Sequence, residues 1–263
     1  MIYNEPDRIV KKSMRYFFIE PSKISGSRSI ITGSDARHIK TVLRLKPSDK
    51  IGLYDGTGVE YLAEIISFSK GSITVSITDS FPSTAESPVQ IAIAQAFLKE
   101  KKMDGLVRQL TELGITTWVP FFAERSVSRP DKKQLLTRSQ RWKKIAKEAL
   151  KQCKRGRIIE IVEPVSYEEM LSIGECFDLK IVFWENECQS VNAKLPKPDR
   201  QIKSIFAVLG PEGGLTSREI ERARNRGFIT AALGPRILRA QTATLSASVL
   251  LQHIFGDMGQ KKS

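Results

Sequence analysis

Cysteine and histidine are scarce in this sequence. The three cysteines, Cys153, Cys176 and Cys188, are an odd number at irregular spacing, and the chain has only two histidines. A structural zinc site needs closely paired ligands of these types, so we expect no metal. The sequence also lacks any apolar run of the roughly 18 residues that a membrane-spanning helix needs, and its start lacks the apolar core of a signal peptide. These absences predict a cytoplasmic protein that does not enter the membrane.

Acidic residues are too few to balance the basic ones. The 263 residues contain 42 Lys and Arg against 29 Asp and Glu, which gives a formal net charge of +13. Residues 99–157 alone hold 17 Lys and Arg against 6 Asp and Glu, so a net charge of +11 lies in that one region. Clustered cations bind polyanions by releasing condensed counterions, which favours RNA as the partner. A lysine-rich surface that only keeps the protein soluble is the alternative.

The chain contains neither a Gly-x-Gly-x-x-Gly fingerprint nor a Walker-type Gly-Lys-Ser/Thr, which disfavours an ordinary Rossmann nucleotide site. It does contain one sequence pattern twice: an apolar run of strand length that leads into Leu-Gly-Pro. The two apolar runs are residues 205–209 and 228–233. Between them, Thr216 and Glu219 have capping-box spacing, and Gly227 is a natural helix C-cap. Ligands of open α/β sheets bind beyond the carboxyl ends of the strands, so two glycine turns at adjacent strand ends predict a nucleoside pocket. A Gly-Pro that only terminates its strand is the alternative for each turn.

Three motifs at this end of the chain resemble those of a known protein family. Gly-Pro-Glu-Gly-Gly (210–214), Leu-Gly-Pro-Arg-Ile-Leu-Arg (233–239) and Thr-Ala (242–243) resemble the C-terminal signature of the ribosomal small subunit methyltransferase E family, which belongs to the SPOUT class of knotted methyltransferases. The resemblance implies a homodimer that uses S-adenosylmethionine to methylate N3 of one uridine in 16S ribosomal RNA, the RNA of the small subunit. It also implies an α/β fold, in which a SPOUT-type parallel-sheet domain with a C-terminal trefoil knot follows a small PUA-like β-barrel.

The rest of the chain predicts these two domains. Residues 14–82 are rich in short β-like runs separated by turn residues, with one helix at 35–43, and they resemble the PUA-like RNA-binding barrel of the family. Residues 1–13 precede the usual start of the family and are interpreted as an extension, which is either disordered or an artefact of the start site. A polar, proline-bounded joint at 79–88 separates the barrel from the second domain.

Residues 89–258 alternate between strands and amphipathic helices, which predicts a parallel sheet with helices on its faces. This is the expected methyltransferase domain. We expect its last helix, at 242–255, to pack through four apolar side chains: Leu245, Val249, Leu250 and Ile254.

By resemblance, main-chain groups and apolar side chains at the strand ends hold the cofactor, together with one acidic residue: Glu185, Leu209, Gly210, Pro211, Gly213, Gly214, Leu233, Gly234, Ile237 and Leu238. Uridine N3 has to lose its proton before it is methylated, and a nearby arginine would stabilise the developing anion. Arg239 or Arg236 is expected to do so. Glu212 is the candidate general base, with capping of the following helix as its alternative role.

The sequence departs from the family at one position near this arginine. Members commonly read Ile-Leu-Arg-Thr-Glu-Thr-Ala, whereas this chain has Ala240 and Gln241 in place of Thr-Glu. Glutamine cannot accept a proton as a carboxylate does. Either the position is structural in the family, or this protein handles the proton differently or works poorly.

The predicted RNA contacts are basic residues in both domains. One lies in the barrel, two lie in the loop that opens the basic region, and three share the cationic side of the helix that Trp142 anchors: Arg44, Arg125, Arg129, Lys143, Lys147 and Lys151. By resemblance, Gln152 and Arg155 lie near the target nucleotide, while capping or packing is an equal alternative for each.

Two other functions stay open at this point. SPOUT relatives also methylate the ribose 2′-hydroxyl or other bases, and the turns alone do not choose among these positions. The chain could also be a non-catalytic RNA-binding assembly factor that keeps the barrel and the basic helix, with Gln241 as the best support for that function.

Overall fold

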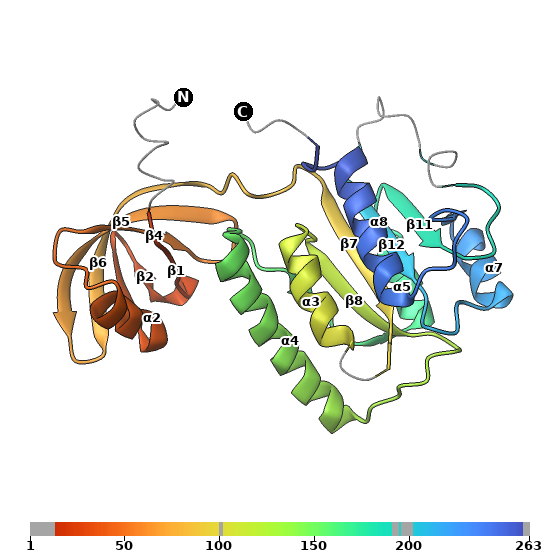
Figure 1. Ribbon diagram of the computed structural model, residues 1–263, viewed down its shortest axis with the longest axis horizontal. Helices are drawn as coiled ribbons and strands as arrows, with labels where there is room; N and C mark the ends of the chain where they lie inside the picture. Colours follow the sequence, from red (N-terminus) through yellow and green to blue (C-terminus); the bar gives the residue numbers. More distant parts are fainter. Residues whose placement is uncertain (1–13, 100–101, 191–194, 196–201, 260–263) are drawn as a thin grey trace. The chain divides into compact units, whose positions relative to one another are not determined.

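The computed structural model describes residues 14–99, 102–190, 195 and 202–259, and its chain divides into two units (Figure 1). The first unit comprises the chain up to Glu86 together with Leu150–Ile158, and the second comprises Ser87–Ala149 and the chain from Ile159. The predicted extension at 1–13 lies outside the described residues. The predicted joint at 79–88 overlaps the last strand of the first unit, which runs to Pro82. Among the described residues, no helix is both long and apolar enough to span a membrane.

The first unit is a six-stranded sheet in the order β1-β4-β5-β6-β3-β2. Its strands are β1 (Tyr16–Phe18), β2 (Ile24–Ser25), β3 (Arg28–Thr32), β4 (Lys50–Tyr54), β5 (Val59–Ser69) and β6 (Ser72–Pro82). β1 pairs with β4 in parallel and the other neighbours pair antiparallel. β2 and β3 have little strand signal in the sequence, because their serines and arginine alternate with only a few apolar residues.

A short helical segment crosses this sheet and completes its core. It begins as α2 (Gly33–Arg37) and continues as one π-helical turn (His38–Val42), which confirms the predicted helix. A 3-10 turn at Pro21–Lys23 precedes β2. Ile39 is fully buried against strand residues such as Ile51 and Val75.

The second unit contains a parallel sheet in the order β10-β8-β7-β12-β11-β13, with β9 paired to β8. Its strands are β7 (Gln90–Ala96), β8 (Thr117–Phe122), β9 (Glu160–Ile161), β10 (Val165–Ser166), β11 (Leu179–Phe183), β12 (Ser204–Leu209) and β13 (Ile229–Ala231). Its helices are α3 (Lys102–Glu112), α4 (Lys132–Cys153), α5 (Tyr167–Gly174), α7 (Ser217–Asn225) and α8 (Ala240–Ile254). The predicted α/β class with a parallel sheet is confirmed.

Helices cover both faces of this sheet. β7 alternates between two cores, since Ile91 and Ile93 face one cluster while Ala92 and Ala94 face the other. α3, α4 and α8 pack on the first face, and Figure 1 shows α8 beside β7 and β12. α5 and α7 pack on the second face. Such two-sided burial explains why the strands read as continuous apolar runs.

The inward face of α8 differs from the expected one. Thr244, Ala247, Ser248, Leu251 and Gln252 are buried, whereas Val249 is 42% exposed and Leu245, Leu250 and Ile254 are only partly buried. The prediction was right in part for Leu245 and Leu250, which pack against the core, and wrong for Val249, because buried polar side chains with hydrogen-bond partners occupy much of the inward face. One of them, Gln252, donates from Nε2 to Leu113 O at 3.0 Å. Leu245 and Leu250 still pack against the core on this face of the sheet, whereas Val249 lies at the surface of the chain.

Candidate functional site

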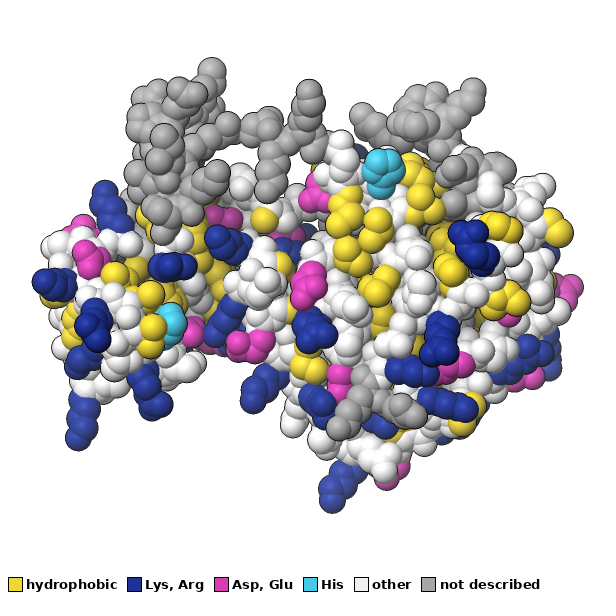
Figure 2. Space-filling view, viewed as in Figure 1, with side chains coloured by type: hydrophobic (Ala, Val, Ile, Leu, Met, Phe, Trp, Pro, Cys, Tyr) yellow, Lys and Arg dark blue, Asp and Glu magenta, His cyan; other side chains and the backbone are white. Residues whose placement is uncertain are grey.

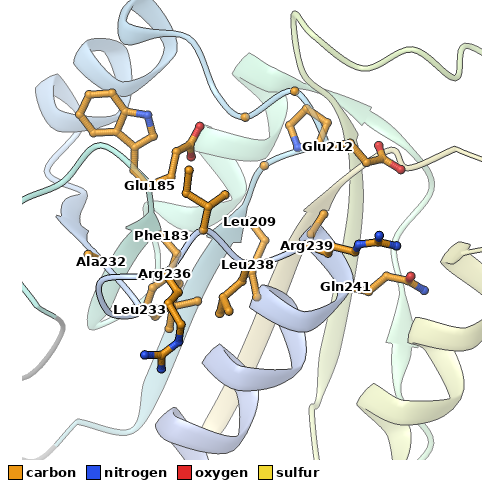
Figure 3. A pocket seen from close by; sticks show the side chains of 18 of the residues that line it. Phe183, Glu185, Leu209, Glu212, Ala232, Leu233, Arg236, Leu238, Arg239 and Gln241 are labelled. Carbon is orange, nitrogen blue, oxygen red and sulfur yellow. The ribbon is translucent and has the colours of Figure 1, made fainter.

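One cavity of about 640 Å³ lies at the carboxyl ends of β11, β12 and β13. Its walls come from three segments, namely 183–185, 209–214 and 232–243, together with Lys102 (Figure 3). All ten residues that were expected to hold the cofactor line this cavity: Glu185, Leu209, Gly210, Pro211, Gly213, Gly214, Leu233, Gly234, Ile237 and Leu238. Arg239, Arg236 and Glu212 line it as well.

The two glycine turns were expected at the ends of adjacent strands. In the structure, the strands that they follow are not adjacent. β11 lies between β12 and β13 and pairs with both in parallel. The three carboxyl ends still meet at one edge of the sheet, so the turns face the same cavity. Because β11 is inserted, Phe183, Trp184 and Glu185 form a third wall between them.

The turn at 210–214 depends on glycine. Gly214 has a φ of +69°, in the left-handed region, and a Cβ there would collide with the carboxylate of Glu185. A Cβ on Gly210 would come within 3.1 Å of the Leu215 side chain. The backbone of this turn therefore reaches the cavity wall without side chains in the way.

The chemistry of the wall fits an amphipathic nucleoside ligand. Leu209, Leu233 and Leu238 supply apolar surface, and the turns supply main-chain groups. A cavity of this size with few polar groups is typical of a small-molecule site.

Glu212 lies at the rim of the cavity and is held by cations. Its Oε1 accepts hydrogen bonds from Lys102 Nζ at 3.0 Å and from the backbone N–H of Lys99 at 3.1 Å. Burial alone would raise the pKa of the Glu212 carboxyl. Hydrogen bonds from Lys102 and from the backbone N–H groups of Glu212 itself and Lys99 outweigh it and lower that pKa below its usual value. A carboxylate in this setting is a poor proton acceptor at neutral pH.

Arg239 is the N-cap residue of α8, and its side chain is exposed. It lies on the same side of the cavity as Glu212 and Gln241, whereas Arg236 lies near Leu233 (Figure 3). Its backbone oxygen accepts from the N–H of Ala243, but its guanidinium has no hydrogen-bond or ion-pair partner within the part of the chain that the structure describes and is available to a ligand. This position favours Arg239 over Arg236 as the residue that meets an anion.

Gln241, where the family commonly has glutamate, makes a contact that glutamate could not. Its Nε2 donates to the backbone oxygen of Lys102 at 3.4 Å. A carboxylate has no proton to donate there. The contact supports a structural role for this side chain at the rim of the cavity.

The predicted RNA-binding residues of the second unit differ in their solvent exposure and in their hydrogen bonds to the protein. Arg125 donates from Nη1 to Gly213 O at 3.0 Å, which ties its loop to the glycine turn. Arg129 donates to Ala123 O at 3.4 Å. On α4, Lys143 is exposed and Lys147 is partly buried, while Trp142 is fully buried as expected. Arg125 is the only one of the four that touches the cavity-lining turn within the described residues.

Among the predicted RNA-binding residues of the first unit, Arg44 and Gln152 are exposed, and Arg44 has a φ of +53°. Lys151 pairs with Asp35 at 3.2 Å. Arg155 corrects the prediction, because its side chain is only 3% exposed and its Nη2 lies 2.9 Å from Glu86 Oε2. A guanidinium that is buried in this way cannot reach an RNA phosphate.

Glu86 uses its remaining oxygen on the backbone. Its Oε1 accepts from the N–H groups of Gly156 at 3.0 Å and Arg157 at 2.9 Å. The pair of Arg155 and Glu86 therefore holds the returning segment 150–158 against the end of the first sheet. The geometry therefore supports a packing role for Arg155, which was the alternative to RNA contact.

Sequence reasoning missed three residues that shape the site. Lys102 lines the cavity and holds Glu212, and the buried side chains of Gln95 and Thr244 lie directly behind the wall. The only available signal was a glutamine close to the end of an otherwise apolar strand. No spacing rule would have connected Gln95 to a helix that begins 145 residues later.

Comparison with known proteins gives this fold and site a class. Residues 85–252 match the family model described as an RNA methyltransferase domain, and residues 31–78 match the one described as an RNA methyltransferase PUA domain. The parallel-sheet unit with its glycine-lined cavity and the preceding β unit thus define an RNA methyltransferase with a PUA domain.

The relatives narrow this class to one family. The ribosomal RNA small subunit methyltransferase E of Bacillus subtilis is 33% identical over 89% of this chain and 94% of its own length. The enzyme of the same name from Aquifex aeolicus is 30% identical over 91% of this chain and 100% of its own length. The chain belongs to the ribosomal RNA small subunit methyltransferase E family.

Two solved structures show the same architecture. The crystal structure of the family member from Neisseria gonorrhoeae bound to S-adenosyl methionine has a TM-score of 0.79 at 28% identity, over 93% of this chain and 99% of that one. A methyltransferase structure from Legionella pneumophila with bound S-adenosyl methionine has a TM-score of 0.78 at 27% identity, with the same coverage.

Proposed function

We propose that this protein transfers a methyl group from S-adenosylmethionine to N3 of a specific uridine in 16S ribosomal RNA. The observation that carries the proposal is the glycine-lined cavity, whose wall contains every residue that the family signature assigns to the cofactor. Family membership and the cofactor named for the two similar structures support it. Because the substrate is part of the ribosome, the same proposal places the enzyme in the cytoplasm.

The cofactor, when bound, supplies an electrophilic methyl group. The glycine turns hold it through main-chain groups, and Leu209, Leu233 and Leu238 cover its apolar parts. N3 gives its proton to solvent water, and Arg239 stabilises the negative charge left on the uracil ring, since its guanidinium is at the rim of the cavity without a protein partner among the described residues. Because the pKa of Glu212 is lowered, we do not assign it the role of general base. Its role is to form the ion pair with Lys102.

Each unit contributes its own set of basic residues to RNA binding. In the second unit we assign Arg125, Arg129, Lys143 and Lys147 to phosphate contacts, and Arg125 joins this group to the cofactor turn through Gly213. In the first unit we assign Arg44, together with Lys151 and Gln152. Such contacts position RNA without reading its sequence.

We also propose that the enzyme is a homodimer. α8 leaves part of its apolar stripe at the surface, since Val249 is 42% exposed and Ile254 is only partly buried. Figure 2 shows apolar side chains gathered over the position of α8. A second copy of the same face would cover this apolar stripe.

The trefoil knot implied by the family is part of the same proposal. It is supported by the strand order, because the chain leaves β13 at one end of the sheet and returns to place α8 against β7 and β12. Segment 232–239 makes this return along the cavity wall.

The test is methyl transfer to small ribosomal subunits that lack the modification, followed by mass-spectrometric mapping of the modified nucleoside. We expect 3-methyluridine at one position, and Gly214→Ala should reduce the rate by weakening cofactor binding. A Cβ on Gly213 would meet Arg125 and leave the cavity open, so Gly214 is the better position to perturb.

The alternatives predict different results. A methyl group found on a ribose oxygen or on another base would keep the enzyme class and replace the target. Cofactor-free RNA binding with no methyl transfer under any condition would instead identify an assembly factor. Sedimentation of the wild type and Val249→Asp tests the dimer, and we expect the variant to be monomeric.

A further inference from the structure

The carboxamide of Gln95 lies behind the cavity and is fully buried. Gln95 is the penultimate residue of β7, which lies between β8 and β12 in the sheet. Its Nε2 donates to Ala96 O at 3.0 Å and to Gly210 O at 3.1 Å. Its Oε1 accepts from the hydroxyl of Thr244. One side chain thus contacts a strand, the cofactor turn and α8.

The end of the β12 ladder explains why this amide is required. Leu209 pairs in register with Gln95, so the next donor toward the carbonyl of Ala96 would be the N–H of residue 211. That residue is Pro211, which has no N–H. Gln95 supplies the missing donor, and its second N–H satisfies Gly210 O. Unpaired carbonyls in this buried position would be costly.

The orientation of the amide follows from the same contacts. Both groups near Nε2 are carbonyl oxygens and need a donor, so Oε1 has to face Thr244 and accept its hydroxyl proton. Thr244 Oγ1 also lies 2.8 Å from Ala240 O, within the first turn of α8. The hydroxyl has one proton, which these two acceptors share, and the link fixes the first turn of α8, whose residues line the cavity directly after the N-cap Arg239.

We propose that Gln95 and Thr244 are positioning residues for cofactor binding. They join two walls of the cavity, the Gly210 turn and the start of α8, and fix the distance between them. This inference rests on the proposal that S-adenosylmethionine occupies the cavity. It adds that cofactor affinity depends on a buried hydrogen-bond link that does not itself touch the cofactor.

The variant that tests the link is Thr244→Val, which removes the hydroxyl and keeps the shape of the side chain. Ser248→Ala is the matched control, because Ser248 is equally buried on α8 and its hydroxyl donates only to Thr244 O among the described residues, at 2.8 Å. Thr244→Ser restores the hydroxyl. Calorimetric titration with S-adenosylmethionine and thermal unfolding are measured for all four proteins.

We expect Thr244→Val to raise the Kd for S-adenosylmethionine by about tenfold, the effect of one buried hydrogen bond. Thr244→Ser and Ser248→Ala should stay within about twofold of the wild type, since both keep the link intact. In steady-state kinetics, Thr244→Val should raise the KM for S-adenosylmethionine and leave the KM for the ribosomal substrate unchanged. Mere loss of stability would lower the amount of active enzyme, and hence apparent kcat, without changing either KM.

Wild-type affinity in a folded Thr244→Val protein would overturn the inference, and so would an equal loss in Ser248→Ala. Failure of the underlying pocket would look different. In that case Gly214→Ala would bind S-adenosylmethionine as tightly as the wild type, which would refute the cavity as the cofactor site and the inference with it.

Discussion

Replacing Gly214 by alanine should damage cofactor binding more than it damages the fold. Alanine at a φ of +69° costs about 1–2 kcal/mol of stability, which lowers the Tm of a chain of this size by about 2–8 °C. The new Cβ would also take the place of the Glu185 carboxylate, so Glu185 has to leave the cavity wall. If Glu185 makes one charge-assisted hydrogen bond to the cofactor, about 1.5–3 kcal/mol of binding is lost. The Kd for S-adenosylmethionine should then rise about 10- to 150-fold in calorimetric titration.

A double-mutant cycle separates the two effects. Glu185→Ala should lose a similar part of the affinity, and the double variant Gly214→Ala with Glu185→Ala should lose little more than either single variant, because all three lack the same contact. Gly105→Ala is the control for a glycine replacement elsewhere. Its Cβ would meet only Gln109 Oε1, at 4.0 Å, in the interior of α3, so affinity should not change. Additive losses in the cycle, or an unchanged Kd in Gly214→Ala, would refute the reasoning.

Three further predictions follow from the other contacts of the site and of the two units. Arg239→Ala should lower kcat about 100- to 1000-fold with little change in cofactor affinity, and Arg236→Ala, on the other side of the cavity, should have a far smaller effect; equal losses in single-turnover assays would contradict the assignment. Lys143→Glu should weaken RNA binding and reduce its salt dependence while the Kd for S-adenosylmethionine stays the same, as filter binding at several salt concentrations can show. Arg155→Ala should lower the free energy of unfolding by about 2–4 kcal/mol, because it removes the cation that pairs with the partly buried Glu86 carboxylate and leaves only backbone N–H donors there; urea denaturation measures this loss, and weaker RNA binding with unchanged stability would argue against the structural role.

The surroundings of Glu212 show how charge is arranged at the mouth of the cavity. Lys102 and Glu212 form an ion pair at 3.0 Å, and the Arg239 guanidinium remains without a protein partner among the described residues. The acidic residue therefore neutralises one cation and leaves the other exposed to the ligand. This arrangement favours an anionic reaction partner beside Arg239, as a deprotonated uracil would be.

The local features of the fold were predictable because short-range physics sets them. The capping box of Thr216 and Glu219 is present as expected, and Gly227 has the positive φ of a helix C-cap. Apolar runs at 50–54, 90–96 and 205–209 form strands, because a strand that is buried on both faces needs no polar positions. β9, by contrast, is a strand of two residues, since only Glu160 and Ile161 pair with β8.

The packing of α8 and the burial of Arg155 were less predictable. Hydrophobicity alone would turn Val249 toward the core, yet the hydrogen bonds of Thr244 and Gln252 orient the helix the other way. Arg155 reads as one more cation of a basic region, and only its partner Glu86, which is 69 residues distant in sequence, makes it structural. Both errors concern side chains whose partners lie far away along the chain.

The sequence by itself determined the class of the fold, the family and the two glycine turns of the cavity wall, because glycine turns, capping residues and the family motifs are properties of contiguous segments. Only the tertiary structure decided that β11 lies between β12 and β13, that Gln95 replaces the donor that Pro211 lacks, and which arginines are free. The physical reason is that strand order and side-chain pairing depend on contacts between residues that are distant in sequence. Many alternative pairings satisfy the same local preferences, and only the packed structure selects one of them.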